Sequence, residues 1–295
     1  MRVWHSRRRS LRRLVPFLFL APFLVLFAFF LITPLAYALR MALYSDRLVG
    51  GSVYVGSANL ARALHDGDFY EGLRHMAVFG VFQIPVMIGL ALLFALLIDA
   101  RAVWLPGLFR LGFFLPFAVP TVIAALMWGN LYDPGYGPLA QLSRHIGLGT
   151  PGFLTSRGML ASLGNIVTWE WTGYNMIILY AALKTIPRDV IEAAAVDGAS
   201  PWQTALKVRI PLIKPALVLT IVFSIIGTLQ LFNEPQIMYV VAPEVIGTHY
   251  TPNVYAYNLA FTGHEFNYAA AVSFLLGAVV FVGSYTFLFL TRRQR

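Results

Sequence analysis

The sequence contains no cysteine and little charge. Without cysteine the chain can form no disulfide, no thiolate nucleophile and no cysteine-ligated zinc or iron–sulfur site. Charged residues make up 12% of the 295 positions and hydrophobic residues 58%, against about 25% and about 45–50% in soluble domains. No polar stretch is long enough for an independent soluble domain. The composition excludes a soluble globular protein and predicts one domain embedded in a membrane.

Lysine is also scarce, and its placement excludes a nucleotide-binding loop. The three lysines, Lys184, Lys207 and Lys214, lie in one segment and none follows a glycine, so a G-x-x-x-x-G-K-[ST] phosphate loop is impossible. The histidines are scattered without metal-ligand spacing, and no G-x-S-x-G nucleophile motif occurs. We therefore predict no catalytic residue, no metal site and no cofactor bound by this chain, which is not an enzyme.

Six mostly apolar runs are long enough to cross a bilayer as helices, which requires about 20 residues each. Because open strands leave backbone groups unsatisfied in lipid, an all-α integral membrane fold is expected. The fourth and fifth runs are the least apolar. The predicted spans are Leu14–Leu39, Met76–Ile98, Leu108–Leu131, Met159–Leu183, Pro215–Val240 and Tyr268–Leu290.

The net charge of +9 is explained by orientation rather than by nucleic acid. With the amino terminus in the cytoplasm, 16 of the 22 Lys and Arg residues fall on the inner side, as the positive-inside rule requires. The first run exceeds the 7–15 residues of a signal-peptide core, so an uncleaved helix is expected. We divide the chain into a basic cytoplasmic segment, 1–13, a single transmembrane domain, 14–291, and a basic cytoplasmic tail, 292–295.

The segment between the fourth and fifth spans, Lys184–Pro215, predicts two short helices. Pro187 can open the first helix, and Gly198 supplies a backbone that can end it. Ser200 precedes a proline and fits the N-cap of the second helix, which Pro211 is expected to stop. Such a two-helix knob suits a groove on a partner protein. A loop that packs on its own helix bundle is the alternative.

This segment resembles the EAA motif of permease subunits of bacterial ABC importers. In that motif E-A-A is followed by three residues, a glycine, nine residues and then I-x-L-P. The matching residues here are Glu192-Ala193-Ala194, Gly198 and Val208-Arg209-Ile210-Pro211, with conservative departures at Val208 and Ile210. Together with further blocks such as Gly107–Pro120, this segment makes most of the chain, from about Leu14 to the end, similar to sugar permeases of the maltose-transport type.

The resemblance implies a type I ABC importer permease fold in a bacterial cytoplasmic membrane, with both termini in the cytoplasm. Its partners would be a second permease in a heterodimer, two copies of an ATPase that bind ATP-Mg, and an extracytoplasmic sugar-binding protein. The knob would act as the coupling element that docks on the ATPase. The coupling residues implied are Glu192, Ala193, Ala194, Asp197, Gly198, Trp202 and Pro211.

A conducting path needs polar side chains inside the helix bundle, because a carboxylate facing lipid would cost about 2.5–3.5 kcal/mol or more. Amides and carboxylates can bind sugar hydroxyls, and aromatic rings can stack on the apolar face of a sugar. Alternatively, Trp and Tyr mark membrane interfaces, and Asn or Glu tie two helices together. The candidate path residues are Trp169, Glu170, Tyr174, Asn175, Gln230, Asn233 and Glu234.

The predicted function is import of a mono- or oligosaccharide, with glycerol phosphodiesters or polyols as alternative solutes in related permeases. A second hypothesis is an ion-coupled secondary transporter with Glu170 and Glu234 as proton carriers, which would predict inverted repeats. A membrane-embedded enzyme is a third hypothesis, and it lacks a paired catalytic constellation. Only the importer requires the EAA-like segment.

Overall fold

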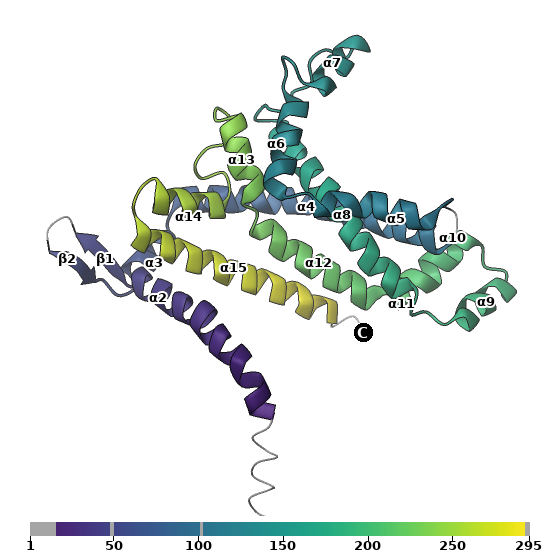
Figure 1. Ribbon diagram of the computed structural model, residues 1–295, viewed down its shortest axis with the longest axis horizontal. Coiled ribbons are helices and arrows are strands. Elements are labelled where there is room, and N and C mark those ends of the chain that lie inside the picture. The colour runs from purple at the N-terminus through teal and green to yellow at the C-terminus, as the bar shows by residue number, and fades with distance from the viewer. Residues whose placement is uncertain (1–15, 48–49, 101–102, 293–295) are drawn as a thin grey trace, which may run out of the picture. The chain divides into compact units, whose positions relative to one another are not determined.

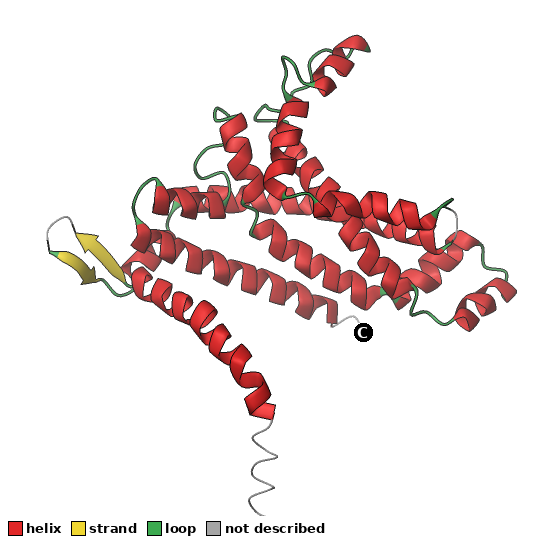
Figure 2. Ribbon diagram, in the orientation of Figure 1, coloured by secondary structure: helices red, strands yellow, loops and turns green. Residues whose placement is uncertain are grey.

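The computed structural model describes residues 16–47, 50–100 and 103–292. The predicted basic segment 1–13, the first two residues of the first span and residues 293–295 of the predicted tail lie outside this range. Helices dominate the described residues, and strands occur only in one hairpin of them (Figure 2). The helical membrane fold predicted from the sequence is confirmed, and the hairpin is an addition that the apolar runs did not indicate.

The chain forms two compact units. The first contains the described residues up to His65, together with Leu259–Leu275. Its long helix, Pro16–Ala42, includes a π-helical turn, η1 (Ala28–Ile32), and continues as α2 (Thr33–Ala42). The hairpin strands β1 (Tyr44–Arg47) and β2 (Gly51–Tyr54) follow, and then the short helix α3 (Ala58–Ala63).

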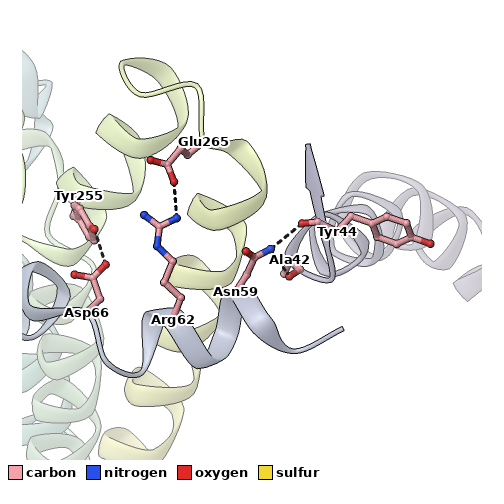
Figure 3. A network of polar contacts seen from close by, with 7 residues as sticks. All are labelled: Ala42, Tyr44, Asn59, Arg62, Asp66, Tyr255 and Glu265. Atoms are coloured by element: carbon pink, nitrogen blue, oxygen red, sulfur yellow. Dashed lines mark hydrogen bonds and ion pairs between the residues drawn. The ribbon is translucent and has the colours of Figure 1, made fainter. Parts of the chain in front are cut away.

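Polar contacts fix α3 within the first unit (Figure 3). The amide of Asn59 donates to the carbonyl oxygens of Ala42, at 3.1 Å, and Tyr44, at 2.7 Å. The guanidinium of Arg62 lies 2.7 Å from a carboxylate oxygen of Glu265. This ion pair is half-exposed, so it contributes at most about 1 kcal/mol.

The second unit contains Asp66–Asn258 and Leu276–Arg295. Asp66 caps α4 by accepting from the backbone of Asp68 and Phe69, and its other carboxylate oxygen accepts from the Tyr255 hydroxyl at 2.6 Å (Figure 3). The helices up to the predicted knob are α4 (Gly67–Asp99), α5 (Pro106–Phe114), the 3₁₀ turn η2 (Leu115–Ala118), α6 (Thr121–Tyr132), α7 (Pro138–His145) and α8 (Met159–Leu183).

The remaining elements carry the knob and the last spans (Figure 1). They are α9 (Arg188–Val196), α10 (Pro201–Thr204), the π-helical turn η3 (Ala205–Arg209), α11 (Ile210–Leu212), α12 (Lys214–Leu229), α13 (Asn233–Val241), α14 (Pro252–Phe261) and α15 (Phe266–Arg292). The two last helices each contribute residues to both units.

Two apolar clusters lie along the packed pair α4 and α8. The first cluster joins Met76 and Phe79 of α4 to Leu163 and Ile166 of α8, with residues of α6 and α13 around them. The second cluster joins α4 and α8 further along, with Ile213 and partly buried residues of α5 and α12. Its buried members are Ala91, Ala95, Ile98, Met176, Leu179, Leu183 and Ile213. These two clusters leave a stretch of α4 and α8 between them.

Among the described residues, three helices are long and apolar enough to cross a membrane: Pro16–Ala42, Gly67–Asp99 and Phe266–Thr291. Two bent helix pairs raise the number to five. The fourth predicted span matches α8, whose 25 residues correspond to about 37 Å. Helix α8 is not among these three helices, because it carries polar side chains such as Glu170 and Asn175, which are buried inside the protein.

The third predicted span is not one straight helix. Pro106–Ala118 and Thr121–Tyr132 meet at 96°. Pro116 and Pro120 stand at this bend. Each proline removes a backbone donor and restricts the residue before it, so a continuous helix would be disrupted here.

The fifth predicted span, Pro215–Val240, is not one continuous helix either. Helix α12 ends at Leu229 and α13 begins at Asn233, so the apolar run contains a break. Pro235 stands in the first turn of α13, where a missing N–H is tolerated, but in a continuous helix it would clash with the carbonyl of Leu231. The polar residues of this run therefore lie at a helix break.

The predicted knob is present, with one correction. Gly198 has φ +77° at the end of α9, and Ser200 caps α10 in a reciprocal capping box with Gln203. Pro211, however, does not stop the second helix, which continues through η3 and α11 to Leu212. In η3 the N–H of Ile210 bonds to the carbonyl of Ala205, and this wider turn accommodates the proline that follows.

Replacement of Gly173 by Ala tests the contact of α8 with α5. A Cβ at Gly173 would overlap the backbone carbonyl of Phe113, so the helices must separate, at a cost of about 1–3 kcal/mol. We expect Gly173→Ala to lower the melting temperature of the purified protein.

Gly164→Ala on the same helix is the matched control. A Cβ there lies 3.8 Å from the nearest atom, in Phe79, and alanine favours a helix by about 1 kcal/mol over glycine. We expect no loss of stability in this variant. Equal melting temperatures for both variants would contradict the close approach of α5 and α8.

Candidate functional site

A cavity of about 300 Å³ lies in the second unit where α12 ends and α13 begins. Its other walls come from α4 and α8, in the stretch between the two apolar clusters. On α4 this stretch contains Gln83 and Met87, and on α8 it contains Trp171, Tyr174 and Asn175. The two clusters thus flank a more polar space along the helix pair.

One wall of the cavity is aromatic. The Tyr174 ring stacks on Phe117 of η2 with centroids 4.7 Å apart, and Trp171 meets the same phenylalanine edge-on at 5.2 Å. Trp171 and Tyr174 are perpendicular to one another, 5.7 Å apart. Packing against Phe117 holds both rings in place, so their remaining surfaces form a preorganised apolar face.

Amide side chains of α4 and α8 lie beside this wall. Asn175 is buried, donates to the carbonyl of Trp171 at 3.1 Å, and its nitrogen lies 3.7 Å from the sulfur of Met87. Gln83 is also buried, and its amide donates to the Thr168 hydroxyl at 3.5 Å. Both amides keep a carbonyl oxygen that can accept a hydrogen bond.

The break between α12 and α13 supplies the opposite polar wall. Gln230, Asn233 and Glu234 line the cavity there. Glu234 is 5% exposed and stands in the first turn of α13, where the helix dipole favours an acidic group. Glu170 on α8 lies near it and is 3% exposed, and neither of its carboxylate oxygens has a hydrogen-bond partner among the described residues. Two acidic groups therefore lie on or behind this wall.

The helical period separates the predicted residues of α8. Tyr174 and Asn175 line the cavity, Glu170 lies outside its lining, and Trp169 borders a different hollow, with its ring 5.9 Å from that of Trp128. Trp171 was not among the candidate residues, yet it shares a helix face with Tyr174 and Asn175 at positions i, i+3 and i+4. That spacing was the signal in the sequence that could have identified it.

Gln83 and Met87 of α4 were also not among the candidate residues. They lie within an apolar run, and only the packing of α4 against α8 places them at the cavity. Of the seven predicted path residues, five line this one cavity: Tyr174, Asn175, Gln230, Asn233 and Glu234.

The two-helix knob is a separate, exposed feature. None of the residues of α9 is buried, and Glu192 and Ala193 are exposed on it. At the end of α9, the N–H of Asp197 bonds to the carbonyl of Ala193 and that of Ala199 to the carbonyl of Ala194. Gly198, with its positive φ, makes this helix end possible.

Large apolar side chains project from the knob. Val196 is 88% exposed and Trp202 66% exposed. Helices α9 and α10 lie at the end of the second unit where α4 and α8 finish, away from α13 and α14 (Figure 1). The knob therefore presents an apolar surface at one end of this unit.

Comparison with known proteins provides a family and a fold. Residues 87–294 match the family model described as binding-protein-dependent transport system inner membrane component. The lactose transport system permease protein LacF of Rhizobium radiobacter is 34% identical, with 98% of this chain and 99% of the relative covered. The arabinooligosaccharides transport system permease protein AraP of Bacillus subtilis is 27% identical over 92% of this chain and 87% of the relative.

A solved structure supports the fold independently. A chain of a bacterial ABC transporter that imports the acidic polysaccharide alginate superposes with a TM-score of 0.83 at 21% identity, covering 99% of both chains. At this identity the likeness shows the fold alone.

Proposed function

This chain belongs to the family of binding-protein-dependent transport system inner membrane components, and on that premise we propose that it conducts an uncharged di- or oligosaccharide through the cavity between α8 and the α12–α13 break. The chain is a multi-pass inner membrane permease of an ABC importer, and it is not the ATPase. The aromatic and amide-lined cavity carries the proposal for the solute.

The chemistry of the cavity fits a sugar. Pyranose rings have apolar C–H faces that pack on aromatic rings such as Trp171 and Tyr174, and their hydroxyls can bond to amides such as Asn175 and Asn233. An acyclic polyol lacks the flat apolar face. Relatives named for transport of lactose and arabinooligosaccharides support the same class of solute.

The lining of the cavity favours a neutral sugar over an anion. Neither lysine nor arginine belongs to the described lining of the cavity, whereas Glu234 does and Glu170 lies behind it. A glycerol phosphodiester or a uronic acid would bring a negative charge beside these carboxyl groups without a cation to pair with it. The lack of a cation in the described lining therefore supports the proposal of a neutral solute.

Uptake into proteoliposomes that hold the complete transporter tests the solute class. We expect ATP-dependent uptake of a neutral disaccharide or oligosaccharide, with no uptake of a glycerol phosphodiester or an oligouronate. The binding protein must be supplied with each solute, so binding of each solute to it is measured separately. Uptake that persists without ATP would favour an ion-coupled secondary transporter and contradict the proposal.

The two tryptophans of α8 provide a matched test of the cavity. We expect Trp171→Ala to reduce sugar uptake by about tenfold, because loss of an aromatic stacking partner costs about 0.5–1.5 kcal/mol beyond its buried area. Trp169→Ala removes a ring of the same size that does not line the cavity and should leave uptake within about twofold. Equal losses in the two variants, at equal amounts of folded protein, would count against the proposed path.

We also propose that the knob formed by α9 and α10 docks on an ATPase subunit. Val196 and Trp202 expose apolar surface that a soluble partner could bury, and Glu192 is exposed beside them. In the assembled importer a second permease, two ATPase copies and a periplasmic binding protein would complete the path. ATP-Mg would then bind only to the ATPase partners.

The distribution of basic residues supports a cytoplasmic knob. Lys184, Arg188, Lys207, Arg209 and Lys214 all lie in or beside it, and such an excess of positive charge marks the inner side of a membrane. By the same rule we propose that both termini lie in the cytoplasm.

Glu192→Ala and Gly198→Pro test the docking of the knob. Proline cannot adopt the positive φ of Gly198, and loss of Glu192 would leave a basic partner group unpaired. We expect each variant to lower ATPase co-purification at least about tenfold, since breaking a desolvated interface ion pair costs about 2 kcal/mol or more.

Membrane insertion of both variants should be normal, because the knob lies outside the spans. Glu244→Ala alters an exposed glutamate between α13 and α14 and serves as the control with unchanged co-purification. Normal ATPase recovery with both knob variants would contradict the docking role.

A further inference from the structure

An ion cluster joins the knob to the two central helices of the second unit. The Asp99 carboxylate, at the last residue of α4, receives Lys184 Nζ on one oxygen and Arg209 Nη1 on the other, each at 2.9 Å. Lys184 caps the end of α8, and Arg209 ends the π-helical turn η3. Three elements that are far apart in the sequence thus meet at a single side chain.

Two members of this cluster are largely buried. The side chain of Asp99 is 14% exposed and that of Arg209 is 17% exposed, whereas that of Lys184 is 52% exposed. Arg209 Nε is buried without a hydrogen-bond partner among the described residues, so its guanidinium depends on Asp99. The hydrogen bond to Asp99 raises the pKa of Lys184, which keeps that ammonium charged.

Local preferences oppose an aspartate at position 99. The carboxyl end of a helix carries a partial negative charge, which disfavours an acid and favours a base. Asp99 stands at the last residue of the 33-residue helix α4, where the sequence alone would favour a lysine or arginine. Its two cationic partners, Lys184 and Arg209, offset this unfavourable placement.

The ion cluster of Asp99, Lys184 and Arg209 covers one end of the second apolar cluster. Ile98 and Leu183, which precede Asp99 and Lys184 in the sequence, belong to the second apolar cluster, and so does Ile213 just after α11. From there the same cluster continues along α4 and α8 to Ala91 and Met176, which border the cavity residues Met87 and Asn175. Close-packed side chains therefore connect the ion cluster to the cavity.

We propose that Asp99 is the positioning residue through which movement of the knob reaches α4 and α8, and with them the walls of the cavity. Arg209 moves with the knob because η3 continues directly from α10. Its bond to Asp99 makes α4 follow, and the bond of Lys184 to the same carboxylate makes α8 follow with it. This role rests on the proposed docking of the knob on an ATPase.

The motif that the knob resembles does not specify this link. Arg209 occupies the unrestricted position of Val208-Arg209-Ile210-Pro211, and Asp99 and Lys184 lie outside the motif. The ion cluster is a property of the folded chain rather than of the motif.

The test measures sugar imported per ATP hydrolysed by the complete transporter in proteoliposomes. We expect Asp99→Asn to retain ATPase co-purification and ATP hydrolysis while sugar import per ATP falls about tenfold, within the usual range of coupling between sites. Asp99→Glu keeps the charge and should restore most of the ratio. Asp68→Asn, at the exposed first turn of the same helix, should change nothing.

A double variant separates the link from a general loss of stability. If Asp99 and Arg209 act as one link, Asp99→Asn combined with Arg209→Gln lowers the ratio no further than either change alone. The proposal would be overturned if Asp99→Asn lost ATPase association and transport in parallel while sugar import per ATP stayed unchanged. A normal ratio of sugar import to ATP hydrolysis in Asp99→Asn would overturn it as well. Failure of the unaltered chain to bind any ATPase would overturn the proposed function itself, and that outcome is visible before any variant is made.

Discussion

Glu170 lies in the middle of α8, where a lipid-facing carboxylate would cost several kcal/mol, so the helix has to be enclosed by protein. Helix α4 packs along α8, and α5, α6, α12 and α13 provide residues around the pair. Glu170 and Asn175, which keep α8 from being uniformly apolar, are both buried by this enclosure. Burial of one polar helix thus determines the arrangement of the second unit.

Proline determines where this enclosure opens. The bend between α5 and α6 and the break between α12 and α13 both stand beside prolines within otherwise apolar runs. Interrupted helices expose backbone groups, which are tolerated at membrane depth only inside protein or beside a water-filled space. The α12–α13 break borders the cavity. Non-helical backbone and polar side chains are therefore concentrated in one place.

The parts of this fold that the sequence predicted depend on local rules. Apolar length located the spans but not the bend in the third or the break in the fifth. Ser200 and Gly198 located the ends of the knob helices, because capping involves only neighbouring residues. The continuation through Pro211 was missed, since a π-helical turn can absorb a proline and no composition rule indicates where. Gln83 and Asp99 could not be identified as site residues, because their surroundings come from helices distant in the sequence.

A force at the knob would reach the cavity through the close-packed second apolar cluster and the helix breaks beside it. Apolar interiors are close-packed and transmit displacement with little compression, so the second apolar cluster should move as one body with the ends of α4 and α8 at Asp99. The breaks at Pro116–Pro120 and at 230–232 lack continuous helical hydrogen bonding and are the places where such a displacement can be absorbed. Gln230 lines the cavity beside one break, and Phe117 of η2, beside the other, supports its aromatic wall. Displacement at the ion cluster would therefore change the shape of the cavity rather than dissipate along the helices.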